Sequence, residues 1–412
     1  MKFLTLASGL SLLLFFSGCG GSSQPKPRVE GSELQKKLMG KPRELHGSYA
    51  KLFMEPKKNE LLNLMELGLD AHQLGNDREA VKAFDQVLDN LEAFLSDDEA
   101  AKRARSLWEA EGQKEFKGEP YERCMAYFYR GLHYLKSNDF ENARAVFKSG
   151  LIQDMYVEED KYRNDFALLL FLEGYSSFLN GDETLFEDRM KELKMVRPDF
   201  TYNNERFLIL AETGRSPRKV ADGLGHSELK FRRGKRFKDV KVQVSIDGGA
   251  YTPLYPMEDI FVQSTTRGNR AFDKILDGKA VFKKNATEIA STLTAVSSNA
   301  MVFAPLFSNV GNAQGIAGAI GAVGAISAVM ALNATPHADI RFWNNLPDTI
   351  HVLPTNLSPG KHVLKFQYID RDNNVIEGLS QQRTINISEE DHIFWTRSKN
   401  QLSYKQKKRR EF

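Results

Sequence analysis

The chain has 412 residues, of which 41% are hydrophobic and 27% are charged, and its formal net charge is +3. This length and apolar content suit two or three domains with ordinary cores. The nearly balanced charge excludes the strongly basic composition of many nucleic-acid-binding proteins, so we expect no nucleic acid among the partners. The two Cys residues argue against an internal disulfide framework.

The first 18 residues have the pattern of a secretory signal peptide: one Lys, an apolar run and small residues before Cys19. The sequence Phe16-Ser17-Gly18-Cys19 resembles the lipobox of bacterial lipoproteins, with Phe16 where Leu is more usual. That resemblance implies removal of residues 1–18 and lipidation of Cys19. A plain signal peptide or a short membrane anchor is the alternative, although the apolar run is short for a bilayer span.

The residues after Cys19 predict how the chain is held. Residues 19–33 are rich in Gly, Ser and Pro, which predicts a flexible tether. Gly20 stands where proteobacterial lipoproteins retained in the inner membrane tend to have Asp. The resemblance therefore implies a lipid-anchored protein of the bacterial cell envelope, in the outer membrane and facing the periplasm.

Residues 34–214 predict a domain of paired helices. Gly131 is preceded by Tyr127 at four positions and followed by Tyr134 at three. Ala143 and Phe147 stand twelve and sixteen positions after it. The spacing resembles the tetratricopeptide (TPR) repeat. In that repeat, Gly and Ala lie where two helices approach closely, and aromatic side chains fill the groove beside them.

Two further copies of this spacing are present. Gly68 has Ala80 and Phe84 at the same offsets, whereas Gly174 has Phe186 where Ala is expected. The three anchor glycines are unevenly spaced, so extra helical material fills the gaps. We predict a TPR-like solenoid whose concave face binds proteins or peptides. A generic helical bundle, or a spacer with nothing in the groove, is the alternative.

Residues 215–238 contain nine Lys and Arg residues and few aromatic ones. Such a stretch is a poor match to nucleic-acid binding. Contact with anionic lipid headgroups or glycans is one interpretation, and a solvated basic linker is the one we favour. Residues 401–412 form a second basic stretch, which we expect to be a frayed tail.

Residues 239–400 predict a small antiparallel, β-sandwich-like domain. Apolar and polar residues alternate in several short runs bounded by turn residues. The expected strands are 240–246, 350–353, 363–368, 383–387 and 392–395. The predicted class is therefore α+β, with the helical solenoid first.

An uncharged insert interrupts this β-domain. Residues 289–338 contain no Asp, Glu, Lys or Arg, and four glycines recur every third residue: Gly315, Gly318, Gly321 and Gly324. Small residues at helical spacing allow close helix packing, as in membranes. We predict a Gly/Ala-rich helical hairpin over 286–334. It either contacts a bilayer or other copies of the chain, or packs against the β-domain, or forms a flexible loop.

The sequence lacks the usual catalytic and metal-binding motifs, including His-Glu-x-x-His, Gly-x-Ser-x-Gly, a Walker A loop and Cys-x-x-Cys. Its eight His residues show no ligand spacing. A lone thiol on an apolar helix face, Cys124 is expected in the core. We therefore expect no catalytic residue, no metal and no cofactor.

The order of these parts resembles a family of bacterial TPR-containing, outer-membrane lipoproteins. The resemblance implies an envelope location and a context in envelope biogenesis. Our first hypothesis is a non-catalytic scaffold that binds other envelope proteins or peptides. The alternative is a homo-oligomeric, membrane-active assembly or pore component built from residues 289–338. An enzyme with an unrecognised site is the third.

Overall fold

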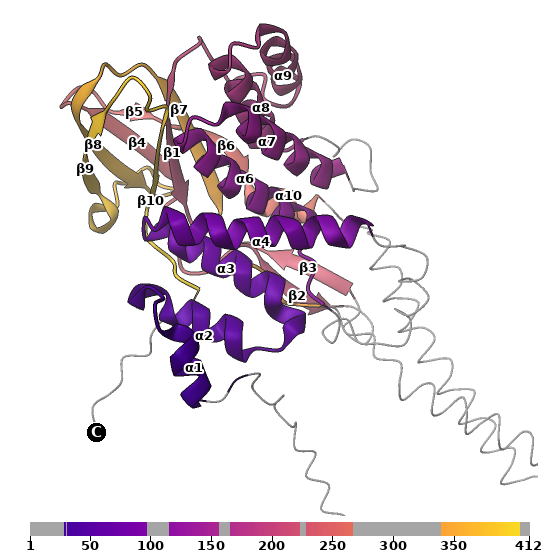
Figure 1. Ribbon diagram of the computed structural model, residues 1–412. Coiled ribbons are helices and arrows are strands. Elements are labelled where there is room, and N and C mark those ends of the chain that lie inside the picture. The colour runs from indigo at the N-terminus through magenta and orange to yellow at the C-terminus, as the bar shows by residue number, and fades with distance from the viewer. Residues whose placement is uncertain are drawn as a thin grey trace, which may run out of the picture.

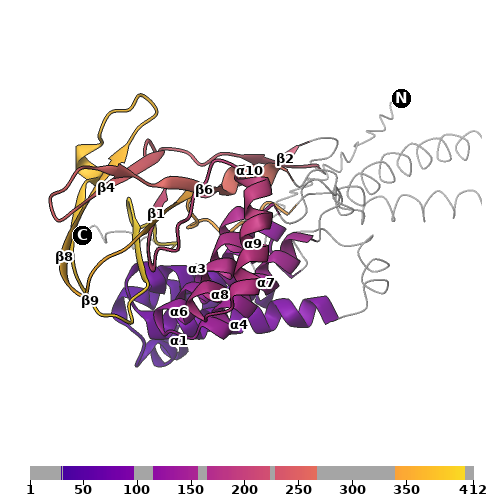
Figure 2. The same ribbon diagram turned by 90° about the horizontal axis from the view of Figure 1, so that it is seen from above.

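The computed structural model describes residue 29 and residues 31–96, 115–155, 165–222, 228–266 and 339–403. Most of its helices gather on one side of the molecule, and its two larger sheets lie on the other (Figure 1; Figure 2). The mixture of helices with mainly antiparallel strands is the α+β class that the sequence predicts.

The described helices are α1 (Gly31–Leu38), α2 (His46–Met54), α3 (Glu60–Gln73), α4 (Asp77–Ser96), α6 (Pro120–Lys136), α7 (Phe140–Met155), α8 (Ala167–Leu179), α9 (Glu183–Val196) and α10 (Ile260–Thr265). The described strands are β1 (Phe207–Thr213), β2 (Arg218–Asp222), β3 (Glu228–Arg232), β4 (Lys241–Ile246), β5 (Thr252–Pro253), β6 (Tyr255–Asp259), β7 (Thr349–Thr355), β8 (Gly360–Ile369), β9 (Gln381–Ile387) and β10 (Ile393–Arg397). Helix α3 packs on α4, α6 on α7 and α8 on α9, which gives three consecutive helix pairs.

The three helix pairs share one turn geometry. The residue seven positions after each anchor glycine has a positive φ, namely 71° at Gly75, 59° at Asn138 and 79° at Gly181. Gly and Asn adopt this left-handed conformation at the least cost. The following residue closes the first helix with its amide and caps the second with its side chain.

These closing and capping bonds recur at the same offsets. The closing amide bonds are Asn76 N to Ala71 O (2.9 Å), Asp139 N to Tyr134 O (3.0 Å) and Asp182 N to Ser177 O (2.8 Å). The capping bonds are Glu79 N to Asn76 Oδ1 (3.2 Å), Asn142 N to Asp139 Oδ1 (3.2 Å) and Leu185 N to Asp182 Oδ1 (3.4 Å). The chain therefore reverses direction by the same device in all three pairs.

The anchor glycines lie where the two helices of a pair approach most closely. A Cβ added at Gly68 would lie 2.9 Å from the Phe84 ring, and one at Gly131 would overlap the Phe147 ring. At the third anchor, a Cβ added at Gly174 would contact the flexible thioether of Met190, sixteen positions further on. The offset of sixteen residues is thus a helix–helix contact in every pair.

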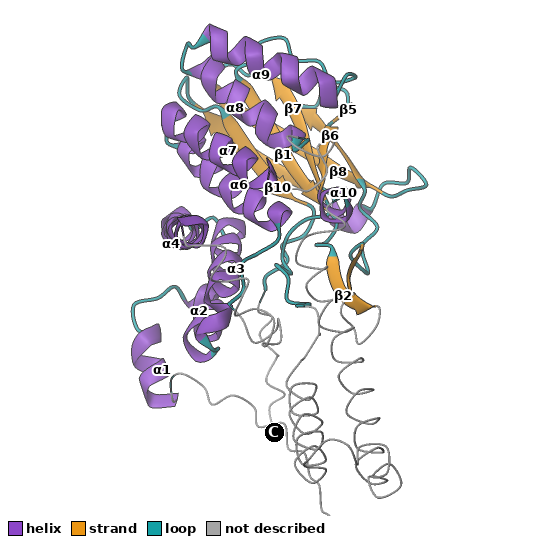
Figure 3. Ribbon diagram, turned by 90° about the vertical axis from the view of Figure 1, so that its right-hand side faces the viewer, coloured by secondary structure: helices purple, strands orange, loops and turns teal. Residues whose placement is uncertain are grey.

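Strand β1 lies between two hydrophobic cores. Leu208 and Leu210 belong to the core shared with the helices, whereas Phe207, Ile209 and Ala211 belong to a second core shared with β4 and β8. Successive side chains of a strand point to opposite faces, so both faces of β1 are covered. The layers are helices, then the sheet that contains β1, then the sheet that contains β4 and β8 (Figure 3).

The strand order of the middle sheet is β10-β1-β7-β6, and that of the outer sheet is β5-β4-β8-β9. Strands β1 and β10 are parallel, while the other neighbours in both sheets are antiparallel. Parallel neighbours need a long connection. Pairing β1 with β10 therefore joins the start of the β portion to its end.

The five strands predicted from alternation are confirmed as parts of β4, β7, β8, β9 and β10. Residues 207–213, near the end of the predicted helical domain 34–214, form strand β1. Residues 215–238 contain hairpin β2–β3 in place of the expected linker, and of their nine basic side chains only that of Lys219 is buried. The predictions on residues 1–18, Cys19, the 286–334 insert with Gly315, Gly318, Gly321 and Gly324, and the end of the tail lie outside the described residues.

Candidate functional site

The nine residues marked for repeat packing lie inside the helix pairs. All but one are buried, and the exception is the half-buried Tyr134, whose ring lies 3.6 Å below the guanidinium of Arg130. The nine are Gly68, Ala80, Phe84, Tyr127, Gly131, Tyr134, Ala143, Phe147 and Gly174. Because these are contacts between paired helices, a functional site has to be sought elsewhere on the molecule.

The first helix of each pair is covered on two sides. Residues 61–73 of α3 and 167–177 of α8 are all buried. A helix that is buried all round needs partners on both faces. The second helix of the pair covers one face, and the chain's own β portion and adjoining segments cover the other (Figure 3). In the described residues the protein's own segments therefore cover this face of the helix pairs, and partner binding by a concave face stays a prediction.

Polar contacts fix the segment 339–346 and the last described residues against α3. The Asn344 amide donates to Glu66 Oε1 at 2.6 Å, and the Asn345 amide donates to Asp70 Oδ1 at 2.7 Å. The backbone N–H of Ser403 also donates to Asp70 Oδ1, at 2.8 Å. Burial raises the pKa of Glu66 to about 7, although the nearby Lys51 opposes the shift.

A second buried carboxylate joins α6 to the β2–β3 hairpin. Glu122 Oε1 accepts the backbone N–H of Trp343 at 2.7 Å, and Glu122 Oε2 accepts Lys219 Nζ at 3.0 Å. Lys219 also lies 3.2 Å from Glu119. Burial raises the pKa of Glu122 and lowers the pKa of Lys219, while each partner opposes the shift of the other.

A third buried carboxylate, Glu212 of β1, joins that strand to α6 and β10. Its Oε1 accepts Tyr129 Oη at 2.8 Å and Trp395 Nε1 at 3.0 Å, and its Oε2 lies 3.5 Å from the guanidinium of Arg397. Buried charges need such partners. These carboxylates therefore help to hold the layers together.

Two adjoining grooves open on the outer side of the helical layer. The larger, of about 250 Å³, lies between α3 and α4 and is lined by Glu60, Leu64, Gln86, Asp89 and Asn90. The smaller, of about 120 Å³, is lined by Lys41, Tyr49, Leu52, Phe53, Leu67, Lys82, Ala83 and Gln86. Gln86 belongs to both, so the two form one surface, hereafter the outer groove.

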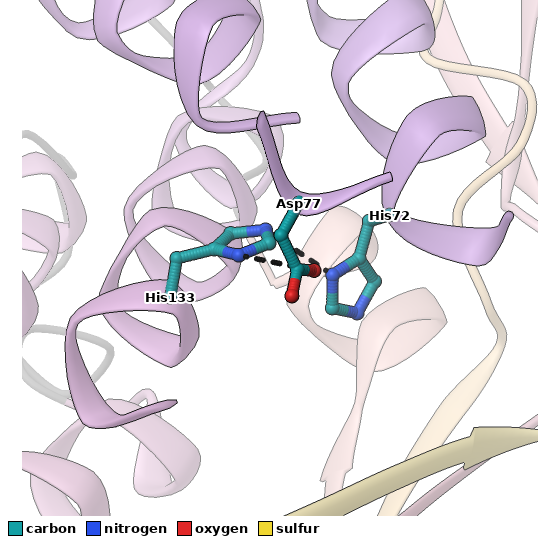
Figure 4. Close-up of side chains that lie close together, drawn as sticks. All are labelled: His72, Asp77 and His133. Atoms are coloured by element: carbon teal, nitrogen blue, oxygen red, sulfur yellow. Dashed lines mark hydrogen bonds and ion pairs between the residues drawn. The ribbon is translucent and has the colours of Figure 1, made fainter. Parts of the chain in front are cut away.

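A histidine–aspartate cluster lies where the first helix pair meets the second (Figure 4). His72 is near the end of α3, Asp77 opens α4, and His133 is near the end of α6. The Nδ1 of His72 lies 3.3 Å from the Nε2 of His133, and the Nδ1 of His133 lies 3.5 Å from Asp77 Oδ1. One potential ligand atom from each residue lies within 4.8 Å of the others.

Both imidazoles of the cluster are neutral near pH 7. Burial lowers the pKa of His133 to about 4 and that of His72 well below its ordinary value. Both side chains are buried, whereas the Asp77 side chain is 48% exposed. Lys136 pairs with Asp77 Oδ2 at 2.7 Å. Two nitrogen ligands and one oxygen ligand, open to solvent on one side, form a set that binds first-row transition metals.

The sequence analysis missed this cluster because its two His residues are 61 positions apart. A signal was present in the repeat spacing. His72 and His133 stand four and two positions after their anchor glycines, close to the equivalent turns. Stacking of neighbouring repeats brings equivalent helix ends together, so aligning the copies would have placed the two His residues side by side.

No family model, curated protein or solved structure matches this chain. Within the ranges that the structure describes, no helix has both the length and the apolar character needed to span a bilayer.

Proposed function

We propose that this protein is a non-catalytic, lipid-anchored scaffold of the bacterial cell envelope, built from TPR-like helix pairs and a β-sandwich-like portion. The supporting observation is that three helix pairs share the same turn, the same cap and the same glycine contact. Stacked helix pairs of this kind present rigid surfaces to other proteins. Lipidation of Cys19, expected from the lipobox, holds that surface at the outer membrane.

We assign partner binding to the outer groove, because in the described residues the protein's own segments cover the inner face of the helix pairs. The groove combines the stacked rings of Tyr49 and Phe53, 5.7 Å apart, with the cationic side chains of Lys41 and Lys82. Aromatic side chains provide apolar contact area, and charges at the rim select the partner. The other part of the groove carries the acidic Glu60 and Asp89, so the fitting partner is a protein segment with an acidic side chain toward Lys41 and Lys82 and a basic one toward Glu60 and Asp89.

Site-specific crosslinking in living cells tests this assignment. A photo-crosslinking residue at position 86, shared by both parts of the groove, is expected to capture envelope proteins. The matched control is position 191 on α9, where the Lys191 side chain is 70% exposed and far from the groove residues in the sequence. Loss of lipid labelling in Cys19→Ala tests the anchor separately.

The proposal fails if position 86 captures nothing beyond what position 191 captures. Equal capture at both positions would indicate unspecific contact with crowded neighbours. Capture at position 86 that is unchanged in a variant carrying Lys41→Glu and Lys82→Glu would argue against charge selection by the groove. Retention of that capture without residues 289–338 is expected, because the groove residues lie on α2, α3 and α4 and on the segment before α2.

The alternative function is a homo-oligomeric, membrane-active assembly that uses residues 289–338. Fifty consecutive residues without Asp, Glu, Lys or Arg, within which four glycines recur every third residue, support it. The same crosslinking experiment separates the two functions. Self-crosslinks that disappear when 289–338 are deleted, together with leakage of liposomes by the intact protein, would favour the assembly.

A further inference from the structure

The unsatisfied atoms of the histidine–aspartate cluster call for a ligand. Asp77 Oδ1 and His72 Nε2 are buried, and neither has a hydrogen-bond partner among the described residues. Asp77 uses its other carboxylate oxygen to bind Lys136, so Oδ1 faces His133 without a donor. An unpaired carboxylate oxygen that faces two neutral imidazoles costs free energy that a bound cation would recover.

The spacing of the donors fits a small transition-metal ion. Ligand bonds of about 2.0–2.1 Å in tetrahedral geometry separate the ligand atoms by about 3.4 Å. One nitrogen of each imidazole and one carboxylate oxygen of Asp77 lie within 4.8 Å of one another, so a small movement of these side chains would bring all three to that separation. Imidazole nitrogen favours zinc, cobalt and nickel over calcium and magnesium.

We infer that His72, Asp77 and His133 form a binding site for a divalent transition-metal ion of the zinc type. Such an ion takes one nitrogen from each imidazole and Oδ1 from Asp77. The half-exposed side of Asp77 leaves the fourth position to water, as in three-ligand zinc sites. No family model or relative assigns this site, and it is independent of the proposed scaffold function.

Charged neighbours set the strength of this site. Lys136 binds the same carboxylate, and Arg130 and Arg397 add positive potential at His133 and His72 respectively. Asp85 acts in the opposite direction, although it pairs with Arg130. Cations near a metal site weaken binding, so we expect moderate affinity in the native chain and stronger binding once Lys136 is neutralised.

A metal ion at this position would join the first helix pair to the second. His72 and Asp77 belong to α3 and α4, whereas His133 belongs to α6. Because binding occurs only in the folded state, it adds to the free energy of unfolding. A metal-dependent rise in the thermal midpoint is therefore a readout that needs no knowledge of the partner.

Calorimetric titration of the full, untagged chain in detergent with Zn²⁺ tests the site, and Co²⁺ absorption reports the coordination. The native chain should bind one ion, and Asp77→Asn should weaken binding by at least about tenfold, the loss typical of removing even an outer-shell partner. Glu92→Gln, which changes an exposed acidic residue on the same helix, is the matched control and should bind as the native chain does. Lys136→Gln should bind more tightly.

Absence of saturable one-to-one binding would overturn the inference, as would equal affinity in the native chain and Asp77→Asn. Affinities that do not differ among all four proteins would indicate adventitious surface binding only. Circular dichroism shows whether each variant is folded. If Asp77→Asn fails to fold, the comparison with Lys136→Gln decides, because the Lys136 side chain is 42% exposed and dispensable for the core. A Lys136→Gln protein that binds no more tightly would then reject the site.

Discussion

Buried carboxylates form many of the polar contacts between the helices and the β portion. Glu258 of β6 is an example, since its Oε2 accepts the backbone N–H of Leu168 at 3.1 Å and its Oε1 accepts Gln263 at 3.0 Å. Arg197 lies 3.6 Å away and only partly offsets the cost of burial. Burial raises the pKa of Glu258 to about 8 from its ordinary 4.5.

This shift predicts that the fold weakens as pH rises from the acidic range to about 8. Between pH 4.5 and about 8 the folded chain keeps the Glu258 proton while the unfolded chain releases it. The free energy of unfolding therefore falls as pH rises, by up to about 1.4 kcal/mol per pH unit from this group. Glu66 and Asp348, with pKa values raised to about 7 and about 6, add to the fall.

In Glu258→Gln the free energy of unfolding should fall less steeply between pH 6 and 8, because one titrating group has been removed. Urea unfolding at a series of pH values measures it. Glu390→Gln, on an exposed turn, is the control and should follow the native profile. An unchanged slope in Glu258→Gln would show that this carboxyl ionises in the folded chain as it does in water.

The glycine at the closest helix approach makes a second residue-scale prediction. Gly131→Ala would push a methyl group into the Phe147 ring, and overpacking of a core costs about 1–3 kcal/mol. The better helix propensity of Ala offsets about 1 kcal/mol of that cost. We expect a net loss in the free energy of unfolding by urea titration.

Two variants test the reason for that loss. Gly31→Ala, in α1 with no atom within 4 Å of the added Cβ, should cost nothing. Phe147→Leu should recover part of the stability in the Gly131→Ala background, since the smaller side chain makes room. Full stability in Gly131→Ala alone would mean that the ring moves freely.

At the scale of elements, the β2–β3 hairpin is attached to the helices by one buried ion pair. The Lys219 and Glu122 side chains are 2% and 0% exposed. Removing one partner of such a pair leaves a buried charge and costs about 3–5 kcal/mol. We therefore expect Lys219→Met to be strongly destabilised in denaturant titrations.

The double variant Lys219→Met with Glu122→Gln should regain much of the loss, because the fully buried carboxylate no longer carries a charge and the remaining partner, Glu119, is partly exposed. Lys230→Met is the matched control on the same hairpin. Its ion pair with Asp222 is about half exposed on both sides, and exposed pairs contribute about 0–1 kcal/mol. Equal effects of Lys219→Met and Lys230→Met would contradict a buried anchoring role.

The same elements show what sequence could predict. The helix pairs were visible because Gly68 and Phe84 lie sixteen residues apart, so the contact that marks a pair is local in the chain. Strands were visible from alternation over a few residues. The segment that covers α3 could not be predicted, because Asn344 contacts Glu66 across 278 residues. Neither residue type, taken alone, indicates which distant segment it binds.

Candidate sites, too, could be predicted only where their residues lie close together in the chain. The lipobox-like residues 16–19 are contiguous and predict lipidation of Cys19 directly, whereas His72 and His133 meet only where two helix pairs pack together. The burial of one Lys in the basic stretch 215–238 was not predicted, because charge usually implies solvent. Lys219 is buried only because Glu122 lies opposite it, on a helix far away in the chain.

At the scale of the whole molecule, the helical and β parts should not be separable. One hydrophobic core includes Phe84 and Tyr129 from the helices, Leu208 and Ile350 from the middle sheet, and Trp343 between them. Repeat solenoids normally tolerate truncation, because each repeat contacts only its neighbours. Here the inner face of all three pairs depends on residues that follow them in the chain.

We therefore expect a fragment of residues 31–203 to lose cooperative folding. Without the β portion it exposes the apolar inner faces of α3, α6 and α8 and removes the donors that Asn344 and Trp343 provide to Glu66 and Glu122. Large exposed apolar patches favour association. Size-exclusion chromatography and thermal melting by circular dichroism should show aggregation and a broad transition, against one sharp transition for the full chain. A monomeric fragment with a sharp transition would mean that the helix pairs form an independent solenoid and that the β portion only rests on it.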